Sequence, residues 1–265
     1  MAGGSAHRPP PGGLFRRDSV SWRVDREAVV LAGGTCGLLM QIAHPAVAAA
    51  VDAHSDFRTD PFARLRRTLS ASWAIVFGDR PAAERAIGRI NAIHAVVHGV
   101  VPETGSPYRA LDPELLLWVH ATLVDTALQM HDRFVAPLNP AEQDAYHREA
   151  SSVAIRLGVP EALIPATAAE LRTWMGGRIA SGEVRVSPTA RALLPSILYP
   201  TRFPPRWTWD AAHLASISVL HPSIRRQYGL GWGARRERGV ERLAAASRWL
   251  VPRLPSMIRH VPAGR

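Results

Sequence analysis

At 60–68 the chain reads D-P-F-A-R-L-R-R-T, at 93–99 it reads I-H-A-V-V-H-G, and at 112–122 it reads D-P-E-L-L-L-W-V-H-A-T. Apolar residues recur in each piece at the spacing of an amphipathic helix. Each piece also places Arg, Thr or His on a face that otherwise looks buried. Because buried ionisable groups are costly unless they have partners, their recurrence on three successive helices predicts a functional site.

The segments around these pieces are also helical in pattern. Asp or Asn followed closely by Pro recurs near residues 60, 79, 112 and 139, which is typical of a helix start. Glycines at 78 and 158 predict helix ends. Further helices are expected at about 167–179, 188–198, 209–228 and 234–250. Alternation of period two is almost absent apart from 182–187, so the sequence predicts an all-α fold.

The chain of 265 residues is long enough for one large helical domain. Residues 1–17 are rich in Gly and Pro and predict a disordered tail, which leaves 18–265 as a single all-helical domain. The tail has no apolar run of the kind found in secretory signals. We therefore expect a cytoplasmic protein.

The charge of the chain comes from arginine alone. All 32 basic residues are Arg, and the formal net charge is +10. The arginines are dispersed over the helices, which disfavours nucleic acid as a partner. Peripheral contact with anionic lipid head groups remains open. The single cysteine, Cys36, lies in an apolar run and is expected in the core.

Residues 28–51 carry no formal charge and are long enough to cross a bilayer. The segment is broken, however, by Gly33-Gly34, Gln41 and His44-Pro45. Proline at 45 should end a helix near Ala43 or His44. We expect two shorter buried helices rather than a transmembrane span.

The residues of the first piece that carry chemistry are Arg64, Arg67 and Thr68, which share one helix face because they are three and four apart. Leu65, Leu69 and Trp73 form an adjoining apolar surface. A solvated arginine stripe is the alternative interpretation of this pattern.

The other two pieces supply histidines and a threonine. His94 and His98 are four apart and could share a metal, or could be core histidines; the glutamate of a zincin motif is missing. On the third helix a polar stripe is expected to point inward, and hydrogen bonding between helices would explain it equally well. Its members are Trp118, Thr122, Asp125 and Gln129.

The order and spacing of these motifs resemble the catalytic domain of the MpaB and rubber-oxygenase family. The resemblance rests on Q-I-A-H-P-A-V at 41–47, the three pieces above, Y-R-A-L at 108–111 and L-G-V-P at 157–160. It covers roughly 23–232.

The resemblance implies a globin-like helical core that holds haem b. It also implies an oxygenase that uses dioxygen to cleave or oxygenate a C=C bond of a hydrophobic, isoprenoid-like small molecule. In this family the proximal iron ligand is the histidine of an H-A motif, which matches His94. An Arg-x-x-Lys-Thr motif over the opposite face of the haem matches Arg64, Arg67 and Thr68, and a further threonine matches Thr122.

Two features depart from this pattern. Arg67 stands where rubber oxygenases have lysine, and arginine stays protonated at ordinary pH. His44, in the Q-x-x-H-P motif, is a conceivable second axial ligand.

Trp73 is expected to help form the apolar slot for the haem. A non-catalytic haem-binding or lipid-binding helical protein is the alternative function.

Overall fold

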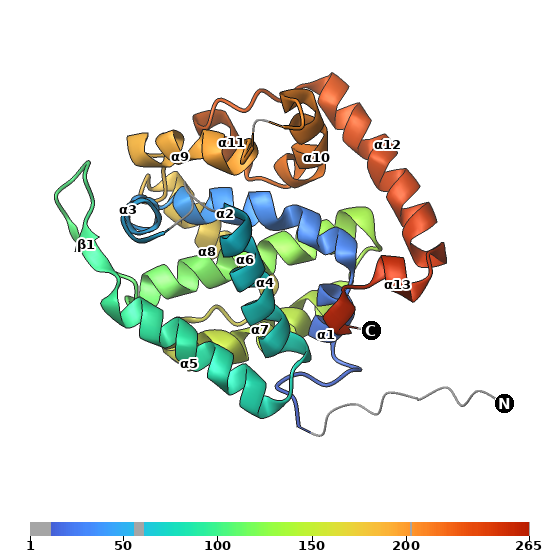
Figure 1. Cartoon of the computed structure of the whole chain (residues 1–265), viewed down its shortest axis with the longest axis horizontal. Coiled ribbons are helices and arrows are strands. Elements are labelled where there is room, and N and C mark those ends of the chain that lie inside the picture. Colours follow the sequence, from blue (N-terminus) through green and yellow to red (C-terminus); the bar gives the residue numbers. More distant parts are fainter. Residues whose placement is uncertain (1–11, 56–60, 202, 265) are drawn as a thin grey trace.

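A computed structural model describes residues 12–55, 61–201 and 203–264, with side chains described throughout except at 61–65. Its regular structure is almost entirely helical, which confirms the all-α fold (Figure 1). The α-helices are α1 Val20–Asp25, α2 Gly34–Ile42, α3 Pro45–His54, α4 Pro61–Phe77, α5 Arg80–Val96, α6 Pro113–Phe134, α7 Pro140–Leu157, α8 Ala168–Ala180, α9 Pro188–Leu198, α10 Arg206–Ser218, α11 Pro222–Gln227, α12 Ala234–Leu250 and α13 Ser256–Arg259. Short 3-10 turns are η1 Ala28–Gly33, η3 Glu161–Leu163, η4 Val251–Arg253 and η5 Pro262–Gly264.

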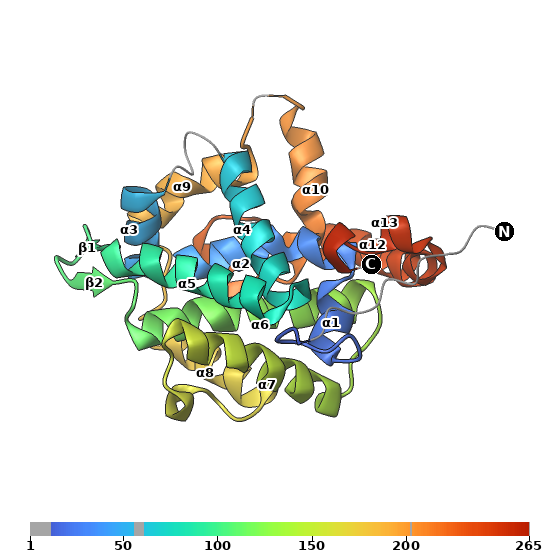
Figure 2. The ribbon, with the colours of Figure 1, turned by 60° about the horizontal axis from the view of Figure 1, so that its bottom comes forward.

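Helix α6 is the centre of the molecule. It packs against η1 and α2 on one side and α7 and α8 on the other, and α12 crosses its C-terminal part (Figures 1 and 2). Apolar residues occur around most of its circumference, as expected for a helix surrounded by others. Its fully buried side chains include Leu117, Trp118, Leu128, Met130 and Phe134.

The predicted helix starts are confirmed where the structure describes them. The side chains of Asp79, Asp112 and Asn139 each accept a hydrogen bond from a backbone N–H of the first turn. Asn139 forms a reciprocal capping box with Glu142. Gly158 ends α7 with a φ of 110°, which only glycine adopts without strain. The expected cap at Asp60 lies outside the described residues.

The uncharged segment 28–51 is broken as predicted. Helix α2 ends at Ile42, His44 caps the next helix, and Pro45 begins α3. Taken together, 28–42 and 45–54 are long and apolar enough to cross a membrane, but they meet at an angle of 108°. No single helix within the described ranges meets that requirement alone.

The sequence predicted that His94 and His98 lie on one helix, and this prediction was wrong. Helix α5 ends at Val96, and His98–Val100 forms strand β1, which pairs antiparallel with β2, Pro107–Arg109. His98 therefore does not share a helix face with His94. The run V-V-H-G-V-V favours extended backbone because valine is β-branched, and the second strand satisfies its hydrogen bonds. The alternating stretch 182–187, in contrast, contains no strand.

The predicted helix 209–228 was also wrong in its bounds. It consists of α10 and α11, with a break before Pro222. Proline lacks the N–H that would continue α10, and it instead begins α11 after the cap at His221.

A bidentate ion pair joins the N-terminal part of the chain to its C-terminal part. The Arg259 guanidinium donates to both carboxylate oxygens of Glu27, at 2.6–3.0 Å. The Glu27 side chain is only 1% exposed. Glu27 also forms an isolated β-bridge with His260. Burial makes this carboxylate dependent on its partner.

Helix α1 is attached to α7 through carboxyl groups. Glu149 accepts a 2.7 Å hydrogen bond from the backbone N–H of Ser21, and the Tyr146 hydroxyl donates to Asp25 at 2.8 Å. Burial raises the pKa of Asp25 to about 7; the hydrogen bond from Tyr146 opposes this shift, and the charge of Glu149 adds to it. Asp25 is therefore protonated in the folded protein over a pH range in which it is ionised in the unfolded chain.

This difference predicts a pH dependence of stability. Between about pH 4 and pH 7 the folded state holds the extra proton, so raising the pH lowers the free energy of unfolding. Asp25→Asn should remove a contribution of at most about 1.4 kcal/mol per pH unit to that slope. Urea denaturation across this range checks it, with the exposed Glu161→Gln as control. An unchanged slope in Asp25→Asn would contradict the assignment.

Candidate functional site

Helices α4 and α5 form the two arms of a hairpin joined at Gly78 and Asp79, and both views show them diverging toward their free ends (Figures 1 and 2). The free end of α4 carries the Arg64 motif, and the free end of α5 carries His94. The side chain of Arg64 lies outside the described residues, whereas Arg67 and Thr68 are exposed to solvent.

Trp73 lies in the half of α4 that is nearer the hairpin turn. It is half-buried and packs with the cluster formed by Trp22, Phe77 and Val261. That contact attaches α4 to the N-terminal and C-terminal parts of the chain.

His94 is half-buried in the last turn of α5. Burial lowers the pKa of His94, so the imidazole is neutral at pH 7. Its Nδ1 atom is buried and has no hydrogen-bond partner among the described residues. Two neighbours on the same helix are exposed, Ile93 at 61% and Val96 at 70%. A neutral imidazole suits a metal ion, and exposed aliphatic side chains on the same helix suit a largely apolar ligand.

His44 is engaged with protein groups. Its Nδ1 accepts a 3.2 Å hydrogen bond from the backbone N–H of Ala46. Its Nε2 lies 3.8 Å from a carboxylate oxygen of Glu183. Burial lowers the pKa of His44, although the Glu183 charge opposes this. The geometry explains the Q-x-x-H-P motif as a helix cap in the structure described here.

The polar stripe predicted on α6 serves several purposes. The Trp118 indole N–H donates to the carbonyl groups of Met40 and Gln41 on α2, at 3.2 and 3.3 Å. Thr122 is fully buried, and its hydroxyl donates to the Val119 carbonyl at 2.7 Å. The interpretation as hydrogen bonding between helices is thus confirmed for Trp118, while Thr122 bonds within its own helix.

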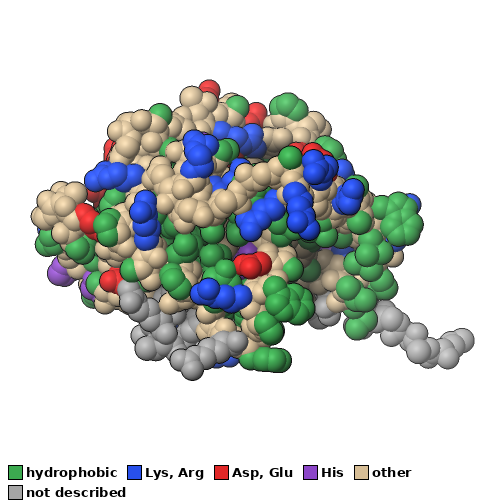
Figure 3. Space-filling model, turned by 90° about the horizontal axis from the view of Figure 1, so that it is seen from above, with side chains coloured by type: hydrophobic (Ala, Val, Ile, Leu, Met, Phe, Trp, Pro, Cys, Tyr) green, Lys and Arg blue, Asp and Glu red, His purple; other side chains and the backbone are tan. Residues whose placement is uncertain are grey.

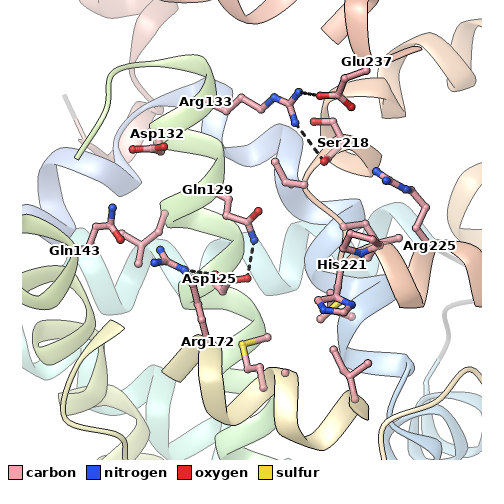
Figure 4. A pocket seen from close by; sticks show the side chains of 18 residues that line it. Asp125, Gln129, Asp132, Arg133, Gln143, Arg172, Ser218, His221, Arg225 and Glu237 are labelled. Atoms are coloured by element: carbon pink, nitrogen blue, oxygen red, sulfur yellow. Dashed lines mark hydrogen bonds and ion pairs between the residues drawn. The ribbon is translucent and has the colours of Figure 1, made fainter. Parts of the chain in front are cut away.

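The remaining stripe residues line a pocket of about 520 Å³ (Figure 4). Asp125 accepts from the Arg172 guanidinium of α8 at 2.9 Å and from the Gln129 amide at 2.6 Å. Arg133 donates to Glu237 of α12 and, at 3.3 Å, to the Ser218 carbonyl. Thr122 and His94 are not among the lining residues, so this pocket is separate from the site predicted at His94 and Thr122.

Sequence analysis did not find the other charged residues of this pocket. They come from α6, α8, α11 with its cap, and α12, and only Asp125 and Gln129 on α6 gave a signal. The missed residues are Asp132, Arg133, Arg172, His221, Arg225 and Glu237. Arg133 and Arg172 both form ion pairs with carboxylates of the same pocket, so their charges are balanced within it.

A second pair of histidines lies between α6 and α7. Burial and the nearby His147 together lower the pKa of His120 to about 4, with burial the larger cause. The His147 Nε2–H donates to the Pro165 carbonyl at 2.7 Å. The His120 Nε2 and His147 Nδ1 atoms are both buried with no partner among the described residues. The His120 ring is therefore neutral at pH 7.

Within the described ranges, no three His, Cys, Asp or Glu side chains converge as a set of metal ligands. An iron porphyrin differs from such centres because it needs only one axial side chain from the protein. His94 is a residue that could supply it.

Comparison with protein families assigns the chain to a family. Residues 22–249 match the family described as the catalytic domain of the ER-bound oxygenase mpaB/B' and rubber oxygenase. The chain belongs to this family. Members of the mpaB/rubber-oxygenase family are described as oxygenase catalytic domains, which supports an oxidoreductase activity.

Two relatives are uncharacterized proteins of Mycobacterium tuberculosis and Mycobacterium bovis. Each is 30% identical over 135 residues, which are 48% of this chain and 51% of the relative. The match thus spans about half the length of these relatives. No solved structure matches the chain.

Proposed function

We propose that this protein is a haem b-dependent oxygenase that uses dioxygen to cleave or oxygenate a C=C bond in a hydrophobic, isoprenoid-like small molecule. Membership of the oxygenase family over 22–249 carries the reaction class. The haem and the substrate class rest on the resemblance of the motifs and on the chemistry of the residues near His94.

Three observations support haem as the cofactor. The His94 imidazole is neutral, its Nδ1 has no protein partner among the described residues, and aliphatic side chains on the same helix are uncovered. A bound haem supplies an iron centre that activates dioxygen. We propose that His94 holds it through Nε2.

The arginines of α4 are the proposed partners of its charged groups. The α4 arm carries Arg64, Arg67 and Thr68 in the half that is far from the hairpin turn, and the α5 arm carries His94 in the corresponding half. A guanidinium can bind a propionate with two parallel hydrogen bonds. Since an arginine side chain does not act as a base or iron ligand at ordinary pH, we assign Arg67 an electrostatic role in this protein.

An uncovered apolar surface favours a hydrophobic substrate. Leu123, midway along the central helix α6, is 53% exposed. Gly37 of α2 lies beside it, where an added Cβ would stand 3.8 Å from the Leu123 side chain. Covering this exposed leucine with an apolar ligand would remove apolar surface from water, which is favourable.

Thr122 is the proposed polar residue next to this surface. Thr122→Val keeps the shape and removes the hydroxyl, and the Val119 carbonyl loses only one of its possible donors. We expect dioxygen consumption to fall more than tenfold while the free energy of unfolding changes by about 1 kcal/mol or less. Thr126→Val, one turn further along α6, is the matched control. Equal activity in both variants would make Thr122 merely structural.

The proposed cleavage balances without a further reductant. One dioxygen adds across the C=C bond, the bond breaks, and two carbonyl groups each retain one oxygen atom. The side chains of this chain would hold the cofactor, orient the alkene and exclude water from it.

An absorption spectrum tests the proposal most directly. The purified protein, supplied with haem, should show a stoichiometric Soret band that shifts after dithionite and carbon monoxide. With ¹⁸O₂ and a short polyisoprenoid alkene, mass spectrometry should find labelled oxygen in the product. Haem binding without labelled product would favour a non-catalytic haem-binding protein, and absence of haem binding would overturn the cofactor assignment.

A further inference from the structure

The net charge of the protein is confined to one part of the chain. Residues 191–265 contain 13 arginines and three acidic residues, whereas residues 1–190 contain 19 of each. The whole formal charge of +10 therefore belongs to the segment that forms α9 to α13. Figure 3 shows basic side chains spread over the face formed by this part of the molecule.

The outward face of α12 concentrates this charge. Val240 and Ala244 are buried and define its inner face. Arg235, Arg238 and Arg242 recur at the spacing of a helix on the opposite side, and all three are exposed. No hydrogen bond or ion pair of these three side chains occurs among the described residues.

The outward face of α12 ends in apolar side chains. Trp249 continues the line of arginines and is 63% exposed, and the Arg253 guanidinium lies 4.7 Å from its ring centroid. Leu250 is exposed beside it, and Ile258 of α13 is 64% exposed. Hydrophobic side chains gather at the right edge of Figure 3, where α12 and α13 lie.

This combination has a specific partner chemistry. Arginines attract anionic head groups, and an exposed Trp with aliphatic neighbours partitions into the region just below them. Nucleic acid would use the arginines but not the aliphatic side chains. A second copy of the chain is disfavoured because the two facing surfaces would carry the same charge.

We propose that the face defined by Arg235, Arg238, Arg242, Trp249 and Leu250, here called the α12 face, docks on an anionic lipid surface. The arginines bind the head groups, and the end of α12 enters the interface. This contact is peripheral, and it rests on residues outside the His94 region, so it is independent of the proposed cofactor.

Vesicle sedimentation of the full chain tests the proposal. Binding to vesicles of phosphatidylcholine with 30% phosphatidylglycerol should exceed binding to pure phosphatidylcholine at least tenfold. The triple variant Arg235→Glu, Arg238→Glu, Arg242→Glu should lose that excess. The matched control changes three exposed arginines on α5 and α7 to Glu, which alters the net charge equally: Arg85, Arg89 and Arg148.

A second readout follows the apolar end of the face. Brominated lipid should quench part of the tryptophan fluorescence of the wild type, and Trp249→Phe should remove most of that quenching. It keeps the proposal testable even if the triple variant does not fold.

Several results would overturn the proposal. They are equal loss of binding in the control variant, equal binding to neutral vesicles, and quenching unchanged in Trp249→Phe. Binding to a DNA duplex but not to vesicles would assign the face to nucleic acid, and a dimer lost in Trp249→Phe would assign it to a second copy.

Discussion

Replacing His94 with alanine is expected to abolish stoichiometric haem binding. The ring supplies a neutral nitrogen, and alanine offers iron no ligand. The absorbance ratio of the Soret band to the protein band after haem titration measures this effect. The variant should otherwise remain folded, because the His94 side chain is only half-buried and its Nδ1 atom has no hydrogen-bond partner among the described residues.

Two histidines provide matched controls. His98→Ala removes an exposed side chain of β1, and His44→Ala removes a helix cap. Both variants should keep the Soret band, and His44→Ala should lose about 1 kcal/mol of stability as the cost of the lost cap. Loss of the band in either control, with His94→Ala unaffected, would reassign the iron ligand.

Arg259→Met is expected to destabilise the protein by roughly 3–5 kcal/mol, because it leaves the Glu27 carboxylate buried without its bidentate partner. Urea denaturation followed by circular dichroism measures the change. Combining it with Glu27→Gln should recover part of the loss, because the buried charge is then absent.

The control for this prediction is an exposed ion pair of the same type. Arg16→Met breaks the bidentate contact with Asp18, where both side chains are solvated, and no measurable loss is expected. Equal denaturation midpoints for Arg259→Met and the wild type would contradict the role of this buried pair.

Local signals made most helices predictable. The capping residues Asp112 and Asn139 act within one turn, and Pro45 lacks the backbone N–H that would continue the preceding helix. Such interactions involve only neighbours in sequence, so the boundaries they set can be recognised without knowing the fold.

The β-hairpin of β1 and β2, which follows α5, could not be predicted in the same way. His98 sits in a run that continues the apolar pattern of the helix, and its strand depends on pairing with Arg109 across a loop. The break at Pro222 is different, because its signal was present in the sequence: proline after His221 marks a new helix start.

The site was predictable only in part. The helices that carry His94 and Thr122 follow from the sequence, and their proposed roles come from the resemblance. The pocket at Asp125 joins Arg172 and Glu237 from separate helices. Its composition depends on how α6, α8 and α12 assemble, which no local pattern specifies.

The Glu27–Arg259 ion pair can form only late in the synthesis of the chain. The two residues are 232 positions apart. At about 5–20 residues per second, a ribosome needs roughly 12 to 46 seconds to add the arginine after the glutamate. During that interval the Glu27 carboxylate lacks its bidentate partner, so the contact between η1 and α13 cannot form in the nascent chain. The last step of folding is therefore expected after most of the polypeptide has left the exit tunnel.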